Sequence, residues 1–192
     1  MSKDRTYPKL FIQMSGAPGS GKSTIARLLG QSIGGVVIDH DVLRSTLLES
    51  DVHFGPAARH AYELQWALAQ DVMKQGLSVI IDSTCNFQVV LDRETELAKE
   101  QGYNYWYVQC QVRDVELLDR RLRSRDSMTS QRTGVDCPPA AANDISESED
   151  SRAIFKRWIE NPCHPEGNNI VIVDSTRKPE ILRDHILKMI AS

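Results

Sequence analysis

The chain has 192 residues, of which 41% are hydrophobic and 26% are charged, and its formal net charge is −3. This composition predicts one globular domain over residues 1–192, large enough to fold without disulfides or a structural metal. The slight negative charge gives no general attraction to nucleic acids or anionic membranes, which disfavours a long polynucleotide substrate without excluding a local basic groove.

Neither a targeting segment nor a membrane span is predicted. Residues 1–8 form a polar leader without an apolar core, and no apolar run approaches the roughly 18 residues that span a bilayer. The four cysteines are scattered and lack the spacing of metal ligands. We therefore expect reduced thiols in a cytoplasmic protein.

The first motif is the phosphate-binding pattern G-x-x-x-x-G-K-[ST], which residues 16–23 match at every fixed position. An apolar stretch over residues 10–14 predicts a strand before it, and apolar residues at helical spacing predict a helix from about Gly21. In this motif backbone N–H groups surround a phosphate chain, Lys22 can bridge the β- and γ-phosphates, and Ser23 can bind Mg²⁺. The predicted nucleotide contacts are Gly16, Ala17, Pro18, Gly19, Ser20, Gly21, Lys22, Ser23 and Thr24.

A second strand is predicted over residues 36–38, followed by a helix that begins among acidic residues. The carboxyl ends of parallel strands beside a phosphate loop line the ligand crevice, so a carboxylate there can take a proton from an attacking hydroxyl. Asp41 is the predicted base, and Arg44, one turn on, can hold the acceptor. Two alternatives stay open: Asp41 can serve only as the helix N-cap, and Asp39 is a rival for the base.

The next helix is predicted over residues 57–74, with apolar residues on two faces. The first stripe, predicted to be core, is Ala61, Leu64, Leu68 and Val72. The second stripe is Tyr62, Trp66, Ala69 and Met73, in which the two aromatic residues are either core or part of an acceptor pocket. His53 and His60 are expected in solvent, with a substrate contact as the alternative.

A third strand over residues 78–82 ends in Asp82, which can order Mg²⁺, often through water, or simply form a turn. Thr84 and Asn86 follow it into the crevice, where they either bind the acceptor or cap the helix predicted over 89–101.

A fourth strand is predicted over residues 103–112 and a helix from Asp114. Arg121 and Arg125 are four residues apart, which would place them on one helical face. Such a pair can follow a polyphosphate and neutralise charge that develops at the γ-phosphoryl group; the alternative is a solvated basic face.

Residues 127–151 lack any periodic pattern and carry the acidic cluster Asp144, Glu147, Glu149 and Asp150. A loop of this length predicts a mobile flap over the nucleotide, so residues 114–152 together form the predicted lid. Beyond it the pattern predicts a helix over 152–159, a strand over 169–174 and a helix over 179–190. The inner face of that last helix is predicted to be Leu182, Ile186 and Met189.

The order of these motifs resembles the P-loop kinases of the nucleoside-monophosphate-kinase-like fold. More narrowly, it resembles the group of polynucleotide 5′-hydroxyl kinases, zeta-toxin-like kinases and chloramphenicol phosphotransferase-like enzymes. The segments that carry the resemblance are Gly16–Ser23, Asp41-x-x-Arg44, Val79–Thr84 with Asn86, and Arg121-x-x-x-Arg125. It implies that Asp41 activates the acceptor hydroxyl, that Arg121 and Arg125 are lid arginines, and that Thr176 and Arg177 flank the adenine.

Strands that alternate with helices predict an α/β fold, and the phosphate loop makes it a three-layer P-loop NTPase fold. We expect a five-stranded parallel sheet with helices on both faces and a lid. The expected activity is an ATP- and Mg²⁺-dependent kinase acting on a hydroxyl of a small molecule or nucleotide. The alternatives are a polynucleotide 5′-hydroxyl kinase and an ATP-hydrolysing regulatory module. The long acidic loop, and the absence of an attached phosphatase or ligase domain, argue against the nucleic-acid acceptor.

Overall fold

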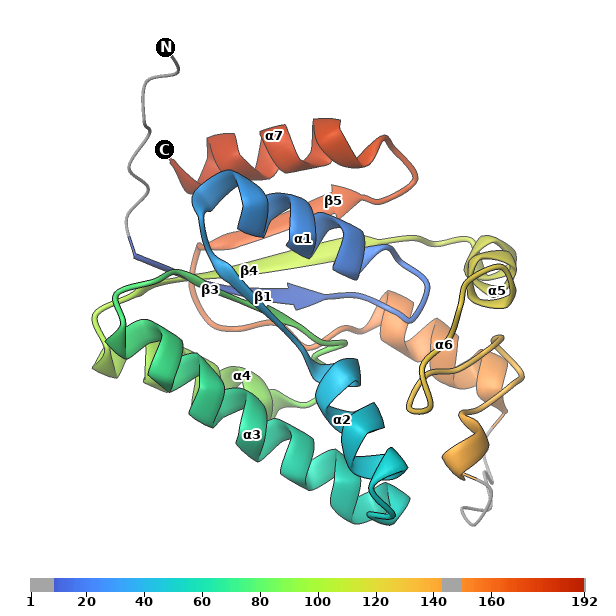
Figure 1. Ribbon diagram of the computed structural model, residues 1–192. Coiled ribbons are helices and arrows are strands. Elements are labelled where there is room, and N and C mark those ends of the chain that lie inside the picture. The colour runs from blue at the N-terminus through green and yellow to red at the C-terminus, as the bar shows by residue number, and fades with distance from the viewer. Residues whose placement is uncertain (1–8, 143–149, 192) are drawn as a thin grey trace.

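The computed structural model describes residues 9–142 and 150–191, and a parallel β-sheet forms its centre (Figure 1). Within these residues the sheet has five strands in the order β2-β3-β1-β4-β5. The strands are β1 (Leu10–Ser15), β2 (Val36–Asp39), β3 (Val79–Asp82), β4 (Asn104–Gln111) and β5 (Ile170–Asp174). All neighbouring strands run parallel, which confirms the predicted fold class.

Helices cover both faces of the sheet: α1 and α7 lie on one face, and α3 and α4 on the other (Figure 1). These helices are α1 (Lys22–Ile33), α3 (Phe54–Lys74), α4 (Gln88–Glu100) and α7 (Pro179–Ile190). Successive residues of β1 point to opposite faces of the sheet. Ile12 packs in the core beneath α1 and α7, and Phe11 packs in the core beneath α3 and α4. Because both faces are covered, β1 and β3 are buried at every residue rather than alternating between core and solvent.

Three further helices lie near the carboxyl ends of the strands (Figure 1). They are α2 (His40–Glu49), α5 (Val115–Arg123) and α6 (Ser151–Glu160), with a short 3₁₀ turn at Ala140–Ala142. Each of the three begins at an aspartate, Asp39, Asp114 or Asp150, whose carboxylate accepts a hydrogen bond from a backbone N–H of the first turn. None of the helices in the described ranges is long and apolar enough to cross a membrane.

Two predicted core faces are partly wrong. In α3 the buried face is Ala57, Ala61, Gln65, Ala69 and Met73, so that Leu64 and Leu68 are each 43% exposed. The small alanines let this helix lie close to the sheet, and a polar residue takes the central place that the hydrophobic pattern would assign to an apolar one. In α7, Met189 is 41% exposed, and Leu187 and Ile190 are buried instead.

Candidate active site

The phosphate loop joins β1 to α1 and has a backbone that side chains would obstruct. Gly16 has a φ of 133°, and a Cβ there would lie 2.3 Å from a backbone carbonyl oxygen of β4. Gly21, also in the left-handed region with a φ of 90°, precedes α1 and provides no side-chain cap for the helix N–H groups. The ammonium of Lys22 donates to the carbonyl oxygens of Gly16 at 3.0 Å and Ala17 at 3.3 Å. This cradle of uncapped N–H groups and a buried lysine fits a phosphate chain.

A cavity of about 500 Å³, here called the loop cavity, lies over the start of α1. Among the predicted nucleotide contacts, its lining includes Gly19, Gly21, Lys22, Ser23, Thr24, Arg125 and Arg177. The predicted lid arginine Arg121 also lines it. Thr176 is not part of the lining; its hydroxyl donates to the carboxylate of Asp174 at 2.8 Å. The predicted adenine-flanking pair is therefore divided, and only Arg177 borders the cavity.

Two carboxylates lie beside the phosphate loop, at the ends of neighbouring strands. Asp39 of β2 and Asp82 of β3 are register partners. Burial raises the pKa of Asp82, while the charge of Lys22 and a hydrogen bond from Ser23 lower it. Burial and the charges of Asp82 and Asp41 raise the pKa of Asp39 to about 6.

These oxygen donors fit a Mg²⁺ ion held chiefly by phosphate. The hydroxyl of Ser23 lies close enough to the carboxylate of Asp82 to lower its pKa. No cluster of three or more His, Cys, Asp or Glu side chains suited to a metal is found among the described residues. Mg²⁺ usually takes only one or two carboxylates and completes its shell with phosphate and water, so the two side chains suffice.

The structure separates the roles of Asp39 and Asp41. Asp39 is the N-cap of α2, since its Oδ1 accepts the backbone N–H of Asp41 at 3.0 Å, and it also pairs with Arg27 at 3.5 Å. The alternative in which Asp41 serves only as the N-cap is thus wrong, because the strand runs directly into the helix and the cap falls two residues earlier. Asp41 lies in the first turn of α2 and lines a second cavity, which Asp39 does not border.

This second cavity, of about 370 Å³, is here called the aromatic cavity because Phe54, Tyr62, Phe87 and Trp158 all border it. The four residues predicted to contact an acceptor also line it: Asp41, Arg44, Thr84 and Asn86. It shares part of its lining with the loop cavity, namely Gly19, Lys22, Ser23, Arg125 and Gln131. The two cavities therefore meet at the end of the phosphate loop.

Arg44 brings a cation into the aromatic cavity. Its guanidinium stacks over the ring of Phe54, with 4.1 Å between the guanidinium carbon and the ring centroid. Burial lowers the pKa of Arg44, and the charge of Asp41 opposes that effect. Its Nε is buried without a hydrogen-bond partner in the described part of the chain.

Arg121 and Arg125 do not share a helical face, contrary to the prediction. Helix α5 ends at Arg123, and Ser124 caps it by donating back to the carbonyl of Arg121 at 3.2 Å. Arg121 donates to the carbonyls of Gly19 at 3.3 Å and Ser175 at 3.1 Å and so links the phosphate loop to the loop after β5.

Arg125 lies beyond the helix and borders both cavities. It donates to the carbonyl of Arg132 at 3.3 Å, and burial lowers its pKa.

Residues 126–142, which are part of the predicted lid, pack against α2. From here on, the word lid refers to these residues alone. Gln131 donates to Oδ2 of Asp41 at 2.8 Å, and the Ser130 hydroxyl donates to Oδ1 at 3.3 Å. The backbone N–H of Ser130 also donates to the Ser45 hydroxyl at 3.0 Å. The predicted flap over the nucleotide thus borders the aromatic cavity as well. Of the predicted acidic cluster, Asp144, Glu147 and Glu149 lie outside the described residues, and Asp150 caps α6.

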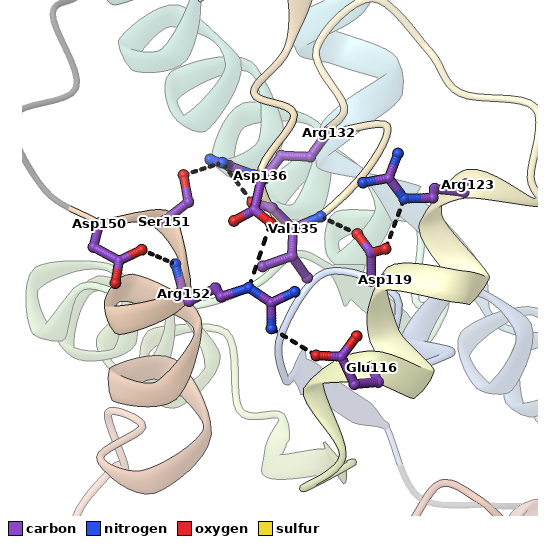
Figure 2. A network of polar contacts seen from close by, with 9 residues as sticks. All are labelled: Glu116, Asp119, Arg123, Arg132, Val135, Asp136, Asp150, Ser151 and Arg152. Atoms are coloured by element: carbon purple, nitrogen blue, oxygen red, sulfur yellow. Dashed lines mark hydrogen bonds and ion pairs between the residues drawn. The ribbon is translucent and has the colours of Figure 1, made fainter.

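Polar contacts hold the other end of the lid between α5 and α6 (Figure 2). Asp119 of α5 accepts the backbone N–H of Val135 at 2.7 Å as well as the guanidinium of Arg123 at 2.6 Å. Arg152 of α6 pairs with Glu116 of α5 at 2.6 Å and with Asp136 of the lid at 3.4 Å. The lid is therefore fixed both at α2 and at the α5–α6 pair.

Sequence reasoning missed His40, Gln65 and Gln131. His40 lines the aromatic cavity beside Asp41, and its Nδ1 lies 3.0 Å from Oε1 of Gln65. Its ring packs against Tyr62 with 4.2 Å between centroids. The only sequence signal was the position of His40 between two aspartates at a strand end.

Comparisons with known proteins support the P-loop kinase fold. A family profile described as an AAA domain matches residues 11–150. No curated protein matches the sequence significantly.

Three solved structures have similar folds. A candidate kinase from Chloroflexus aurantiacus has 17% identity and a TM-score of 0.71, with 97% of this chain and 98% of that one covered. The APS kinase of Mycobacterium tuberculosis, in complex with AMPPNP and APS, has 16% identity and a TM-score of 0.63, with 97% and 99% covered. A gluconokinase from Sinorhizobium meliloti has 16% identity and a TM-score of 0.58, with 97% and 94% covered. At these identities the likeness establishes the fold, which is that of the P-loop kinases.

Proposed function

This chain belongs to the AAA domain family and has the P-loop kinase fold, and from that premise we propose that it is a kinase. It transfers the γ-phosphoryl group of ATP to a hydroxyl of a small molecule or nucleotide. One observation carries the proposal: the loop cavity and the aromatic cavity meet at Lys22 and Ser23, and Asp41 borders only the aromatic cavity. A phosphoryl donor and a hydroxyl acceptor need such a pair of adjoining sites.

On the donor side, the backbone N–H groups of the phosphate loop and the ammonium of Lys22 hold the phosphates. Arg121 fixes the loop through Gly19, and Arg125, at the junction of the cavities, balances charge that develops on the transferred group. Ser23 and Asp82 would hold Mg²⁺, with Thr24 beside them. When bound, the ion neutralises phosphate charge.

On the acceptor side, Asp41 takes the proton of the attacking hydroxyl. Arg44 donates to the acceptor from its place on the Phe54 ring, and Thr84 and Asn86 offer further hydrogen bonds. The protein lowers the barrier mainly by positioning the two substrates and by placing cations around the phosphoryl group.

The size of the aromatic cavity supports a small acceptor. Its volume of about 370 Å³ falls within the range of small-molecule sites, roughly 300–1,000 Å³. The lid, α2, α3 and α6 all contribute to its lining, which favours a compact molecule over the end of a polynucleotide. The structural neighbours described as an APS kinase and a gluconokinase also support a small acceptor. The four cysteines are free, in keeping with a cytoplasmic location.

The test is transfer from γ-labelled ATP to a panel of nucleosides, sugars, antibiotics and 5′-hydroxyl oligonucleotides. We expect a labelled small-molecule product with the wild type and none with Lys22→Ala. Labelled oligonucleotide would identify a polynucleotide kinase. Release of labelled phosphate without any product would favour the regulatory module and contradict the proposal.

A further inference from the structure

A pair of polar side chains lies in the interior between α3 and α4. Gln65 and Glu94 are both completely buried, and Nε2 of Gln65 donates to Oε1 of Glu94 at 2.9 Å. Burial raises the pKa of Glu94 to about 8. Polar groups in such a position cost free energy that apolar residues would not, so this pair is not explained by packing.

Gln65 of this pair also contacts His40, and the geometry of that contact determines which ring nitrogen of His40 carries the proton. The amide nitrogen of Gln65 is engaged by Glu94, so the amide oxygen faces Nδ1 of His40 at 3.0 Å. An amide oxygen only accepts, and Nδ1 must therefore carry the hydrogen. Burial lowers the pKa of His40, which keeps the ring neutral, and in a neutral ring with Nδ1–H the other nitrogen is a bare acceptor.

The free nitrogen lies on the edge of the ring away from Gln65. The ring is held between Gln65 and Tyr62 and borders the aromatic cavity beside Asp41. Over residues 9–142 and 150–191, His40 has no second hydrogen-bond partner that would occupy Nε2. The cavity thus has two neighbouring acceptors, of which the proposed reaction uses only Asp41.

We propose that His40 determines which acceptor is phosphorylated: the Gln65–Glu94 pair holds it as the Nδ1–H tautomer, and its Nε2 accepts a hydrogen bond from a second donor group of the acceptor molecule. The inference rests on the proposed function and narrows it. The acceptor is then a polyhydroxylated compound or an amino alcohol, and a simple alcohol is a poor substrate.

The tautomer can be tested without any ligand or activity. In the full chain labelled with ¹⁵N in its five histidine rings, long-range proton–nitrogen correlation identifies the protonated nitrogen of each ring. His40→Phe assigns the His40 signals. We expect Nδ1–H at His40 in the wild type, and a change towards Nε2–H in Gln65→Met, which keeps the volume but removes the hydrogen bonds.

Gln109→Met is the matched control, because Oε1 of Gln109 lies 2.7 Å from Nε2 of His164. It should alter the His164 signals and leave those of His40 unchanged. Protonated Nε2 at His40 in the wild type, or an unchanged His40 in Gln65→Met, would overturn the proposal.

The role in specificity is tested with the acceptor that the labelled-ATP panel identifies, compared with analogues that each lack one other hydroxyl or amine. For the analogue without the group that meets His40, we expect kcat/KM to fall about 10- to 100-fold in the wild type, chiefly through KM. With the full acceptor, kcat/KM of His40→Phe should be lower than that of the wild type by the same factor. With that analogue, His40→Phe and the wild type should have the same kcat/KM.

Equal discrimination by His40→Phe and the wild type would overturn the proposal, even where the tautomer is as expected. Should the panel give no product at all, the proposed function fails while the tautomer measurement still reports on His40. The two failures are therefore distinguishable.

Discussion

Replacing Glu94 by Gln should change how stability depends on pH. Burial raises the pKa of Glu94 from 4.5 to about 8. Because one pKa unit corresponds to about 1.4 kcal/mol, this rise corresponds to about 5 kcal/mol of unfolding free energy. Between these two values the folded protein keeps a proton on Glu94 that the unfolded chain has released. This carboxyl therefore lowers the free energy of unfolding as pH rises from 4.5 to about 8, and its effect is constant above that range.

The amide of Glu94→Gln does not ionise, so the variant lacks this loss. We expect the variant to gain stability relative to the wild type by about 1.4 kcal/mol per pH unit across this range. Urea unfolding followed by tryptophan fluorescence at several pH values from 5 to 9 measures the difference. Glu96→Gln, an exposed position on the same helix, is the control and should show no such trend. A constant difference between wild type and Glu94→Gln across pH 5 to 8 would refute the reasoning.

Three further changes test the site. Gly16→Ala should lose more than about 2 kcal/mol of stability along with nucleotide binding, since its Cβ would meet a backbone oxygen at 2.3 Å. Thermal unfolding and ATP titration measure the two effects. The control Gly55→Ala, which has open space around its Cβ, should lose neither stability nor nucleotide binding. Gln131→Leu removes a 2.8 Å hydrogen bond to Asp41 and should lower kcat about 10-fold at unchanged stability; an unaltered kcat would argue against this contact in the reaction. Arg44→Lys loses a planar stacked donor and should raise KM for the acceptor alone, so that an equal rise in KM for ATP would contradict its placement.

The sheet and the phosphate loop were predictable because their signals are local. Strands buried on both faces are mostly apolar runs, and residues 16–23 match a motif whose glycines avoid steric clashes. Helix ends were less predictable. A shift of two residues gave the cap of α2 to Asp39, and an early end of α5 separated Arg121 from Arg125.

The interior pair could not be predicted from the sequence. Hydrophobic periodicity predicts apolar residues at buried positions, whereas the burial of the polar Gln65 and Glu94 depends on how α3 packs against α4. The contact between Gln131 and Asp41 joins residues 90 positions apart, and no local pattern encodes it.

The central claim is that Asp41 serves the acceptor and not the nucleotide. Asp41→Asn tests it most directly, by measuring the rate of transfer from γ-labelled ATP and the Kd for ATP on the same preparation. We predict an unchanged Kd and a transfer rate at least about 100-fold lower. Asp39→Asn keeps the cap of α2, and its transfer rate should fall much less than that of Asp41→Asn. Full transfer by Asp41→Asn, with the loss confined to Asp39→Asn, would contradict the account.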